Sequence, residues 1–195
     1  MTQASQKKHK DRHCLIRLAH KRDMPEIVDI QLKSLEILAA KDYQPEQLQV
    51  LLASKRGRRS IFETIFVAEI ESRIVGFIAL DRFTNSISGL FISPQYVRQG
   101  IGTKLIKKVE QEAIRYKIPI LWVCASLTGY PFYLANNYQK IDRTSIQVKG
   151  VLIPCIQMKK ILSTQTKSAQ IQEILYQFFL YSTIIWSLII LITQF

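Results

Sequence analysis

A glycine-containing loop is the first feature of this sequence that could bind a ligand. The apolar residues Leu90, Phe91 and Ile92 lead through Ser93-Pro94 into the loop Arg98-Gln99-Gly100-Ile101-Gly102-Thr103, after which apolar residues recur at helical spacing. The first amides of a helix have no intrahelical partners, and the helix dipole places partial positive charge there. This passage from strand to loop to helix therefore predicts a site for a phosphate or another anion.

The spacing of the loop does not fit two familiar phosphate-binding fingerprints. The dinucleotide pattern needs a third glycine three residues after Gly102, where this chain has Leu105. The P-loop pattern needs Gly-Lys followed by Ser or Thr, and Lys104 does not stand in that position. A plain strand-to-helix turn with two glycines is the alternative interpretation.

A tyrosine-containing segment is the second feature, and with the loop it carries a family resemblance. The loop resembles the acyl-CoA-binding pattern of the GNAT superfamily of N-acyltransferases, Arg/Gln-x-x-Gly-x-Gly/Ala, with Val97 at the first position. Downstream, Ser126, Gly129 and Tyr133 resemble the second signature of that superfamily, Asn-x-x-Ala-x-x-x-Tyr. The full signature continues with three further residues and Gly-Phe, and this chain has Asn137-Tyr138 in place of Gly-Phe. Asn tolerates the left-handed conformation that follows a helix.

This resemblance implies direct acyl transfer from acetyl-CoA to an amine. It assigns the protonation of the departing thiolate to Tyr133 and implies no metal. It assigns cofactor binding to ten residues, which are Leu90, Phe91, Ile92, Arg98, Gln99, Gly100, Ile101, Gly102, Thr103 and Ser126. A backbone N–H on the strand would support the oxyanion. The alternative for Tyr133 is a ring that packs beside Phe132. The base that deprotonates the amine stays open between Glu36, Asp81 and water.

The remaining pattern predicts strands and helices in the order β-αα-βββ-α-β-α-ββ, and the GNAT resemblance implies that they form an α/β fold with a mixed, twisted, mostly antiparallel sheet flanked by helices. Strands are expected at 14–18, 66–70, 74–80, 87–92, 120–124, 140–148 and 151–158. A long helix should begin at Asp23, with Asp23 and Glu26 forming a capping box, and run to Ala40; further helices should begin at Pro45, Ile101 and Tyr130. Tyr43 is expected to anchor a loop.

Charge and cysteine content limit the function classes. The net charge is +12, and much of the excess lies in a basic arm at 1–13 and a basic loop at 55–60. Neither cluster interleaves aromatic residues, so specific nucleic-acid binding is not expected. The three cysteines are far apart and form no C-x-x-C pair, which predicts neither a metal site nor a disulfide framework and fits a reducing compartment. Cys124 is expected to be a buried apolar residue.

The C-terminal residues form a separate unit. A polar linker at 163–173 follows the domain at 14–162, and residues 174–195 carry no charge. As a helix these residues would be long enough to cross a hydrocarbon core of roughly 30 Å. We therefore expect a C-terminal transmembrane helix that holds the catalytic domain at the cytoplasmic side of a membrane, with basic segments near anionic lipid. A helix packed on the domain or on a second copy is the alternative.

The sequence thus supports three hypotheses. The first is a membrane-tethered N-acetyltransferase that uses acetyl-CoA and acts on a small-molecule or peptide amine, with a homodimer allowed. The second is a non-catalytic acyl-CoA-binding sensor or adaptor at the membrane, in which Val97, Ser126 and Asn137 mark lost activity. The third is a basic adaptor at the membrane surface without a ligand.

Overall fold

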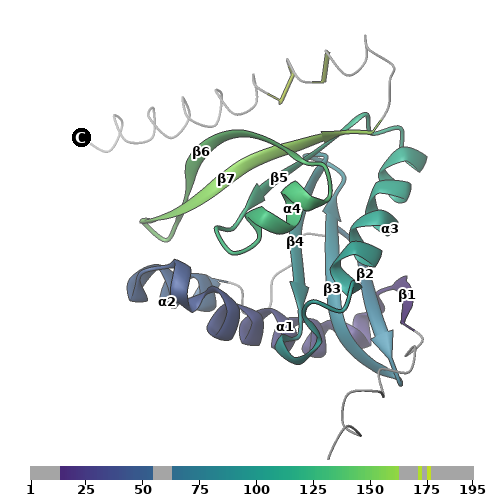
Figure 1. Cartoon of the computed structure of the whole chain (residues 1–195), viewed down its shortest axis with the longest axis horizontal. Helices are drawn as coiled ribbons and strands as arrows, with labels where there is room; N and C mark the ends of the chain where they lie inside the picture. Colours follow the sequence, from purple (N-terminus) through teal and green to yellow (C-terminus); the bar gives the residue numbers. More distant parts are fainter. Residues whose placement is uncertain (1–13, 55–62, 163–170, 173–174, 177–195) are drawn as a thin grey trace, which may run out of the picture.

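One seven-stranded mixed sheet organises the molecule (Figure 1). The computed structural model describes residues 14–54, 63–162, 171–172 and 175–176. The strands follow the spatial order β1-β2-β3-β4-β5-β7-β6 and comprise β1 (Leu15–Leu18), β2 (Glu63–Ile70), β3 (Arg73–Asp81), β4 (Ser86–Ile92), β5 (Ile120–Ala125), β6 (Gln139–Val148) and β7 (Val151–Ile161). Every neighbouring pair is antiparallel except β4 and β5, so the predicted mixed, mostly antiparallel sheet is confirmed.

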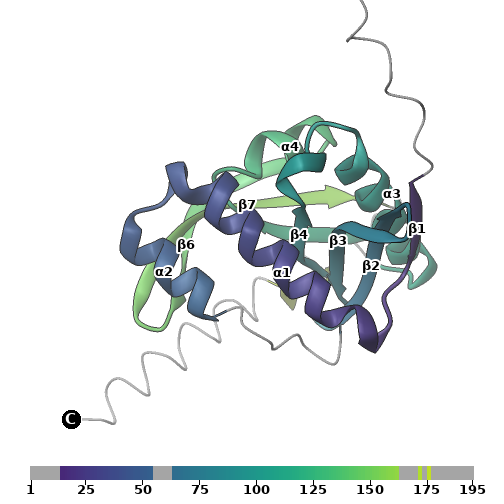
Figure 2. The same cartoon turned by 90° about the horizontal axis from the view of Figure 1, so that it is seen from below.

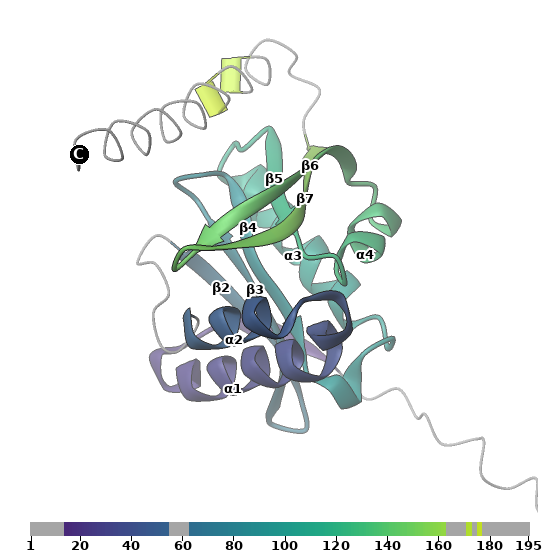
Figure 3. The same cartoon turned by 90° about the vertical axis from the view of Figure 1, so that its left-hand side faces the viewer.

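Helices cover both faces of this sheet. On one face lie α1 (Met24–Ser34) and α2 (Pro45–Ser54), and α1 crosses the strands in Figure 2 and lies beside α2 in Figure 3. On the other face lies α3 (Ile101–Arg115), and the short α4 (Tyr130–Ala135) follows β5. The layers follow from the alternation of β3, because Phe77 packs with α1 while Ile78 packs with α3.

The first helix departs from the expected single helix to Ala40. After α1 the chain forms a π-helical turn at Leu35–Ala39 and a 3-10 turn at Ala40–Asp42. The apolar residues Ile30 and Leu35 are five positions apart, a spacing that a regular α-helix does not hold on one face, and the wider turn buries both. The π-helical turn directs Leu35 and Ala39 toward the centre of the molecule.

Asp23 holds the predicted N-cap position of α1, but the predicted capping box between Asp23 and Glu26 is wrong. Asp23 ends a 3-10 turn and its side chain does not cap α1; its carboxylate instead accepts the His20 N–H at 2.7 Å and pairs with Arg17 at 2.6 Å. Glu26 accepts the N–H of Ile74, on β3, at 3.2 Å. Tertiary partners on neighbouring strands thus replace the local cap, and both carboxylates fix the start of α1 to the sheet.

The sheet opens at its one parallel junction. Strands β4 and β5 pair at Ser86↔Trp122 and Ile87↔Val123. Beyond these pairs the two strands separate, as Figure 1 shows, and both line the same cleft with their later residues. Because β5 continues to pair with β7 and β4 with β3, each arm of the open sheet keeps its own antiparallel partner.

The C-terminal predictions fall mostly outside the described residues. Of the expected transmembrane helix at 174–195, the structure describes Leu175 and Tyr176, and none of the helices it describes is long and apolar enough to cross a membrane. Tyr176 stacks on Trp122 of β5, with ring centroids 4.2 Å apart and planes at 12°. The start of the tail therefore contacts the domain.

Candidate active site

A cleft of about 860 Å³ fills the opening between β4 and β5. It extends from the start of α3 to the helices and turns that follow β1 on the opposite side. Of the residues predicted for cofactor binding and catalysis, all but Gln99 line it. The charged residues among its described lining are Lys41 and Arg98, both cationic, so the field in the cleft favours an anionic ligand.

The start of α3 lines one end of the cleft. Gly100 is its N-cap with φ +76°, and no side chain caps the helix. A Cβ added at Gly100 would meet nothing within 4 Å, so the glycine is needed for its backbone conformation, and the space beside it is open. Arg98 also has positive φ, at 62°. The loop and the first turn of α3 line the cleft, and the binding of an anion to their amides stays a prediction.

Gly102 has a different role from Gly100. A Cβ at Gly102 would lie 3.0 Å from Cε2 of Phe132, so the ring of Phe132 occupies the space that a side chain would need. We interpret this glycine mainly as the contact that seats α4 on α3. It thereby sets the position of Tyr133, the residue after Phe132.

The exposed edge of β4 offers backbone donors to the cleft. The Ser93 N–H donates to Val75 O on β3 at 2.8 Å, and alternate amides of a strand point the same way. Phe91 therefore directs its N–H toward β3, whereas Leu90 and Ile92 direct theirs toward the edge that β5 has left. An extended ligand with amide groups can hydrogen-bond to this edge as an added strand.

Tyr133 lies in the wall of the cleft at the start of the acceptor side. It is 5% exposed, and burial raises the pKa of its hydroxyl far above the ordinary value for tyrosine, which keeps the group protonated. Its ring makes edge-to-face contacts with Phe132 and Tyr138, each at 5.3 Å between centroids. The ring thus packs beside Phe132 as the alternative predicted, and it also lines the cleft; its catalytic role stays a prediction. Asn137, with φ 65°, adopts the predicted left-handed conformation after α4.

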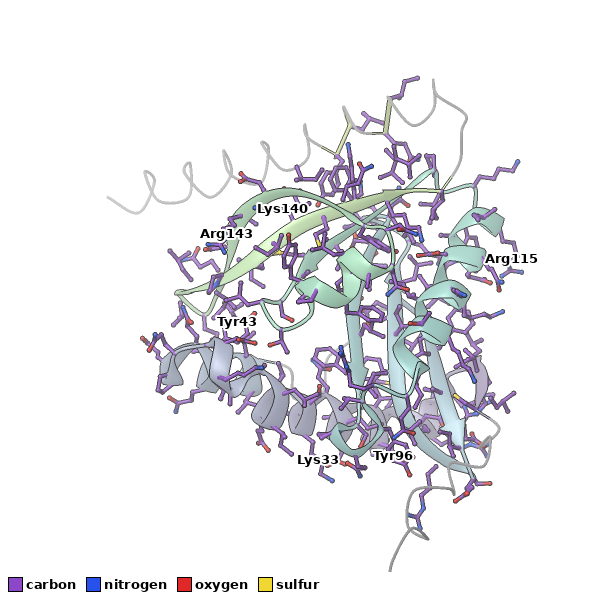
Figure 4. All side chains as sticks on the ribbon, in the orientation of Figure 1. Lys33, Tyr43, Tyr96, Arg115, Lys140 and Arg143 are labelled. Atoms are coloured by element: carbon purple, nitrogen blue, oxygen red, sulfur yellow. A yellow bond between two sulfur atoms is a disulfide. The ribbon has the colours of Figure 1, made fainter. Side chains whose placement is uncertain are left out.

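Two hydroxyl groups brace the loop between β5 and α4. Ser126 Oγ accepts the N–H of Gly129 at 3.0 Å, so this residue caps the turn before α4 while it lines the cleft. Tyr43 accepts the N–H of Leu127 at 3.3 Å and donates to Pro154 O at 3.4 Å. Tyr43 therefore anchors its loop as predicted, between the α1–α2 layer and the β6–β7 hairpin (Figure 4).

Three residues considered for the site lie away from it. Gln99 donates its side-chain amide to Gln95 O at 3.1 Å and does not line the cleft. Glu36 is exposed on the π-helical turn, and Asp81 accepts the amides of Phe83 and Thr84 in a turn. Neither carboxylate lines the cleft, and among the described lining residues there is no Asp or Glu.

Sequence reasoning missed several lining residues on the acceptor side. Most are apolar and come from the π-helical turn, α2 and β7, where no motif marks them: Leu35, Leu38, Ala39, Leu51 and Ile153. Ser88 on β4 was also missed. Its hydroxyl donates to Glu63 Oε1 at 2.6 Å, which brings a carboxylate from β2 within one hydrogen bond of the cleft.

The prediction for the cysteines is wrong in two respects. Cys124 is exposed and lines the cleft, and it forms a disulfide with Cys155 of β7. The apolar run around Cys124 suggested burial, but alternation along β5 places Cys124 on the cleft face between its buried neighbours. Cys14 is a thiol. No three His, Cys, Asp or Glu residues among those described lie together as a metal site would require.

Comparisons with known proteins agree with this architecture. Residues 39–162 match the family model described as the acetyltransferase (GNAT) domain. The chain is 27% identical over 134 residues to the uncharacterized N-acetyltransferase YafP of Escherichia coli K12, an alignment that covers 66% of this chain and 83% of that protein.

Two solved structures share the fold. A GCN5-related N-acetyltransferase from Rhodopseudomonas palustris has a TM-score of 0.71 and 26% identity, with 75% of this chain and 94% of that chain covered. The PaiA N-acetyltransferase of Thermoplasma acidophilum, solved with coenzyme A, has a TM-score of 0.60 and 19% identity, with 76% and 99% covered. The match of the family model over most of the described domain shows that this chain belongs to the GNAT acetyltransferase family and is a transferase of acyl groups.

Proposed function

We propose that this protein transfers the acetyl group of acetyl-CoA directly to an amine. One observation carries the proposal: a single cleft joins the uncapped start of α3, the exposed edge of β4 and the hydroxyl-bearing wall at Tyr133. These parts lie in the order in which an acyl-CoA presents a diphosphate, an amide-containing arm and a thioester. The coenzyme A bound to the PaiA relative supports the same class of ligand.

Each part of the cleft has a separate role in this proposal. The first amides of α3 and Arg98 bind the diphosphate, because both place positive charge at the loop. The amides of Leu90 and Ile92 pair with the extended arm, and one of them supports the carbonyl oxygen as it gains charge. The thioester carbon is then held near the point where β4 and β5 diverge.

Tyr133 assists the departure of the thiol in this proposal. Its raised pKa means that the hydroxyl stays protonated, so it can donate a hydrogen bond to the leaving sulfur. Full proton transfer from such a phenol to a thiolate is uphill, since thiol pKa values lie near ~8.5. The expected contribution is therefore stabilisation of the developing thiolate as the carbon–sulfur bond breaks.

The acceptor side favours an amine with an apolar body. Its described lining is mostly aliphatic and aromatic, and its one cation is the exposed Lys41. A polyamine would place a second positive charge in a cleft whose described lining offers no carboxylate, which carries a desolvation cost. We therefore expect monoamines with apolar bodies to react faster than polyamines, and an anionic group on the acceptor to be tolerated near Lys41.

The test is thiol release from acetyl-CoA with a panel of amines. The panel pairs phenethylamine and leucine with cadaverine and spermidine, and Tyr133→Phe is assayed beside the wild type. We expect the apolar monoamines to be preferred and Tyr133→Phe to lower kcat by about 100-fold while acetyl-CoA still raises the melting temperature. A wild-type protein that binds acetyl-CoA and releases no thiol with any amine would instead support the sensor hypothesis.

Membrane attachment is a separate proposal. The uncharged residues 174–195 support it, whereas the Tyr176–Trp122 contact supports a tail that packs on the domain. Sedimentation with liposomes distinguishes the two, with a chain lacking residues 170–195 as the control. Full-length protein that stays in solution without detergent and does not sediment with liposomes contradicts membrane attachment.

A further inference from the structure

We propose that Ser88 and Glu63 form the proton relay that deprotonates the acceptor amine. This inference rests on the proposed function, because it concerns the same cleft and the same reaction. A protonated amine cannot attack a thioester, so its proton must leave before or during attack. The described lining of the cleft contains no carboxylate. The hydroxyl of Ser88, which lines the cleft, donates a hydrogen bond to the carboxylate of Glu63, which does not.

The backbone of β4 explains why Ser88 faces the cleft at this point. Gly89 pairs with Ala79 and Ile87 pairs with Leu80, so Ser88 is the extra residue of a β-bulge. A bulge turns a side chain out of the regular alternation and is frequent beside active sites. The bulge lies where β4 and β5 begin to diverge, the point at which the proposed function holds the thioester carbon.

The hydrogen-bond direction suits proton transfer toward Glu63. The Ser88 hydroxyl has one hydrogen, and the 2.6 Å distance to Glu63 Oε1 is typical of a charge-assisted bond to a carboxylate. The oxygen of Ser88 then keeps its lone pairs available to accept a proton from the ammonium or from a bridging water. When that proton arrives, Ser88 passes its own hydrogen to Glu63, and the amine that remains is neutral.

The balance of the reaction is complete with these groups. The ammonium loses one proton to Glu63 through Ser88, and the amine nitrogen forms a bond to the thioester carbon. When the carbon–sulfur bond breaks, the sulfur leaves with its electron pair and the new amide nitrogen loses its second proton, which neutralises the thiolate. Glu63 returns its proton to solvent before the next cycle.

Other charged groups near the relay have different engagements. Asp81 is the register partner of Glu63 on β3, and its carboxylate accepts the amides of Phe83 and Thr84. Asp42 accepts a hydrogen bond from the cleft-lining Thr128 and is the competing relay. Thr128 belongs to the loop that begins α4, whereas Ser88 lies in the β4 bulge where β4 and β5 diverge and where the proposed function holds the thioester carbon, so Ser88 is better placed to serve the amine that attacks it.

The decisive variant is Glu63→Gln, which keeps the size of the side chain and its acceptor oxygen but cannot take the proton. We expect kcat/KM at neutral pH to fall by about 100-fold or more, and the deficit to shrink as the pH approaches the pKa of the amine. The deficit should also be smaller for an acceptor whose amine has a lower pKa. A structural role for Glu63 would lower the rate equally at every pH.

Matched variants separate the relay from its alternatives. Ser88→Ala should reproduce the pH-dependent loss, whereas Ser88→Thr keeps a hydroxyl and should retain most of the activity. Glu36→Gln is the control for the substitution itself and should match the wild type. A pH profile that changes in Asp42→Asn and not in Glu63→Gln assigns the proton to the competing pair and overturns the proposal.

Stabilisation by acetyl-CoA distinguishes failure of the relay from failure of the proposed function. Each variant is accepted as folded when acetyl-CoA raises its melting temperature as it does for the wild type. If wild-type protein turns over an amine and folded Glu63→Gln keeps the same rate and pH profile, the relay is wrong and the proposed function stands. If wild-type protein turns over no amine, both are wrong.

Discussion

The two halves of the cleft offer different chemical groups to the ligands that we propose for them. The half at α3 and β4 offers mainly backbone groups, because Gly100 has no side chain and the amides of Leu90 and Ile92 face the gap. The half at the π-helical turn, α2 and β7 offers side chains, most of them apolar. A backbone site depends on conformation and tolerates many side chains, whereas a side-chain pocket changes its specificity with each substitution. The first half suits a constant cofactor, and the second suits a specific acceptor.

The largest effect should follow from placing a negative charge in the backbone half. Gly100→Glu puts a carboxylate beside the amides proposed for the diphosphate, and we expect affinity for acetyl-CoA to fall by at least about 100-fold, roughly 2.7 kcal/mol. Calorimetric titration measures this. Gly100→Ala is the control, because it must adopt the same positive φ, which costs about 1–2 kcal/mol of stability, but it adds no charge. Unchanged affinity in Gly100→Glu would show that the ligand binds elsewhere.

The side-chain half should depend on its disulfide for stability. The bond between Cys124 and Cys155 joins β5 to β7 across 31 residues of sequence, and closing such a loop contributes about 2–4 kcal/mol. We expect reductant to lower the free energy of unfolding by this amount. Thiol titration of the denatured, unreduced chain should find Cys14 alone, with Cys14→Ser as the control. Three reactive thiols would contradict the disulfide.

The ion pair between Asp23 and Arg17, which lies outside the cleft lining, should make the stability of the fold depend on acid without changing substrate specificity. The Arg17 hydrogen bond, with the His20 amide, lowers the pKa of Asp23 to about 2. A lowered pKa means that the pair stabilises the fold above the unfolded value near ~3.9 and loses this contribution as the pH falls toward 2, a change of about 2 kcal/mol. Asp23→Asn should therefore be less stable at pH 7, and the difference from wild type should narrow on acidification. A constant difference between pH 7 and pH 2.5 contradicts the ionic origin.

The smallest effect should come from the contact between α3 of the backbone half and α4. Gly102→Ala places a Cβ against Phe132, while alanine also favours the helix, so the net change in stability should stay within about 1 kcal/mol. The shift of α4 should still lower kcat several-fold and leave acetyl-CoA affinity unchanged. Phe132→Leu in the same chain should restore part of the rate, with Phe132→Leu alone as the control. An equal loss of affinity would place Gly102 in the cofactor site itself.

The backbone half was predictable because its information is local. A strand, Gly100 at an αL position and the start of a helix lie within consecutive residues, so periodicity and glycine placement predicted the loop that the structure contains. The positions of the strands along the chain followed from the same kind of signal, whereas the left-handed residue Asn137 was identified through the family pattern. Tyr133 was found through its family pattern, and its binding role stays a prediction.

The side-chain contacts, in both halves and outside them, were not predictable because the residues that make them meet only in the folded chain. Glu63 reaches Ser88 through a bulge in β4, and no spacing in the sequence relates the two. Cys124 and Cys155 come together because β5 pairs with β7, which a count of cysteines does not reveal. Asp23 has the local signature of a helix cap, yet a strand arginine offers it a stronger partner than the helix amides do.

Because β4 and β5 pair at only two positions, the later backbone amides of β4 have no strand partner on that side until a ligand occupies the cleft. An extended ligand that hydrogen-bonds to the β4 edge would act as an added strand and lie in the gap between the β4 part and the β5 part of the sheet. Solvent exchange at the Leu90 and Ile92 amides should therefore slow when the cleft is occupied, whereas the Phe91 amide, already directed toward β3, should change little. The exchange rates of the Leu90 and Ile92 amides would thus report whether the cleft is occupied, and the Phe91 amide would serve as the internal reference.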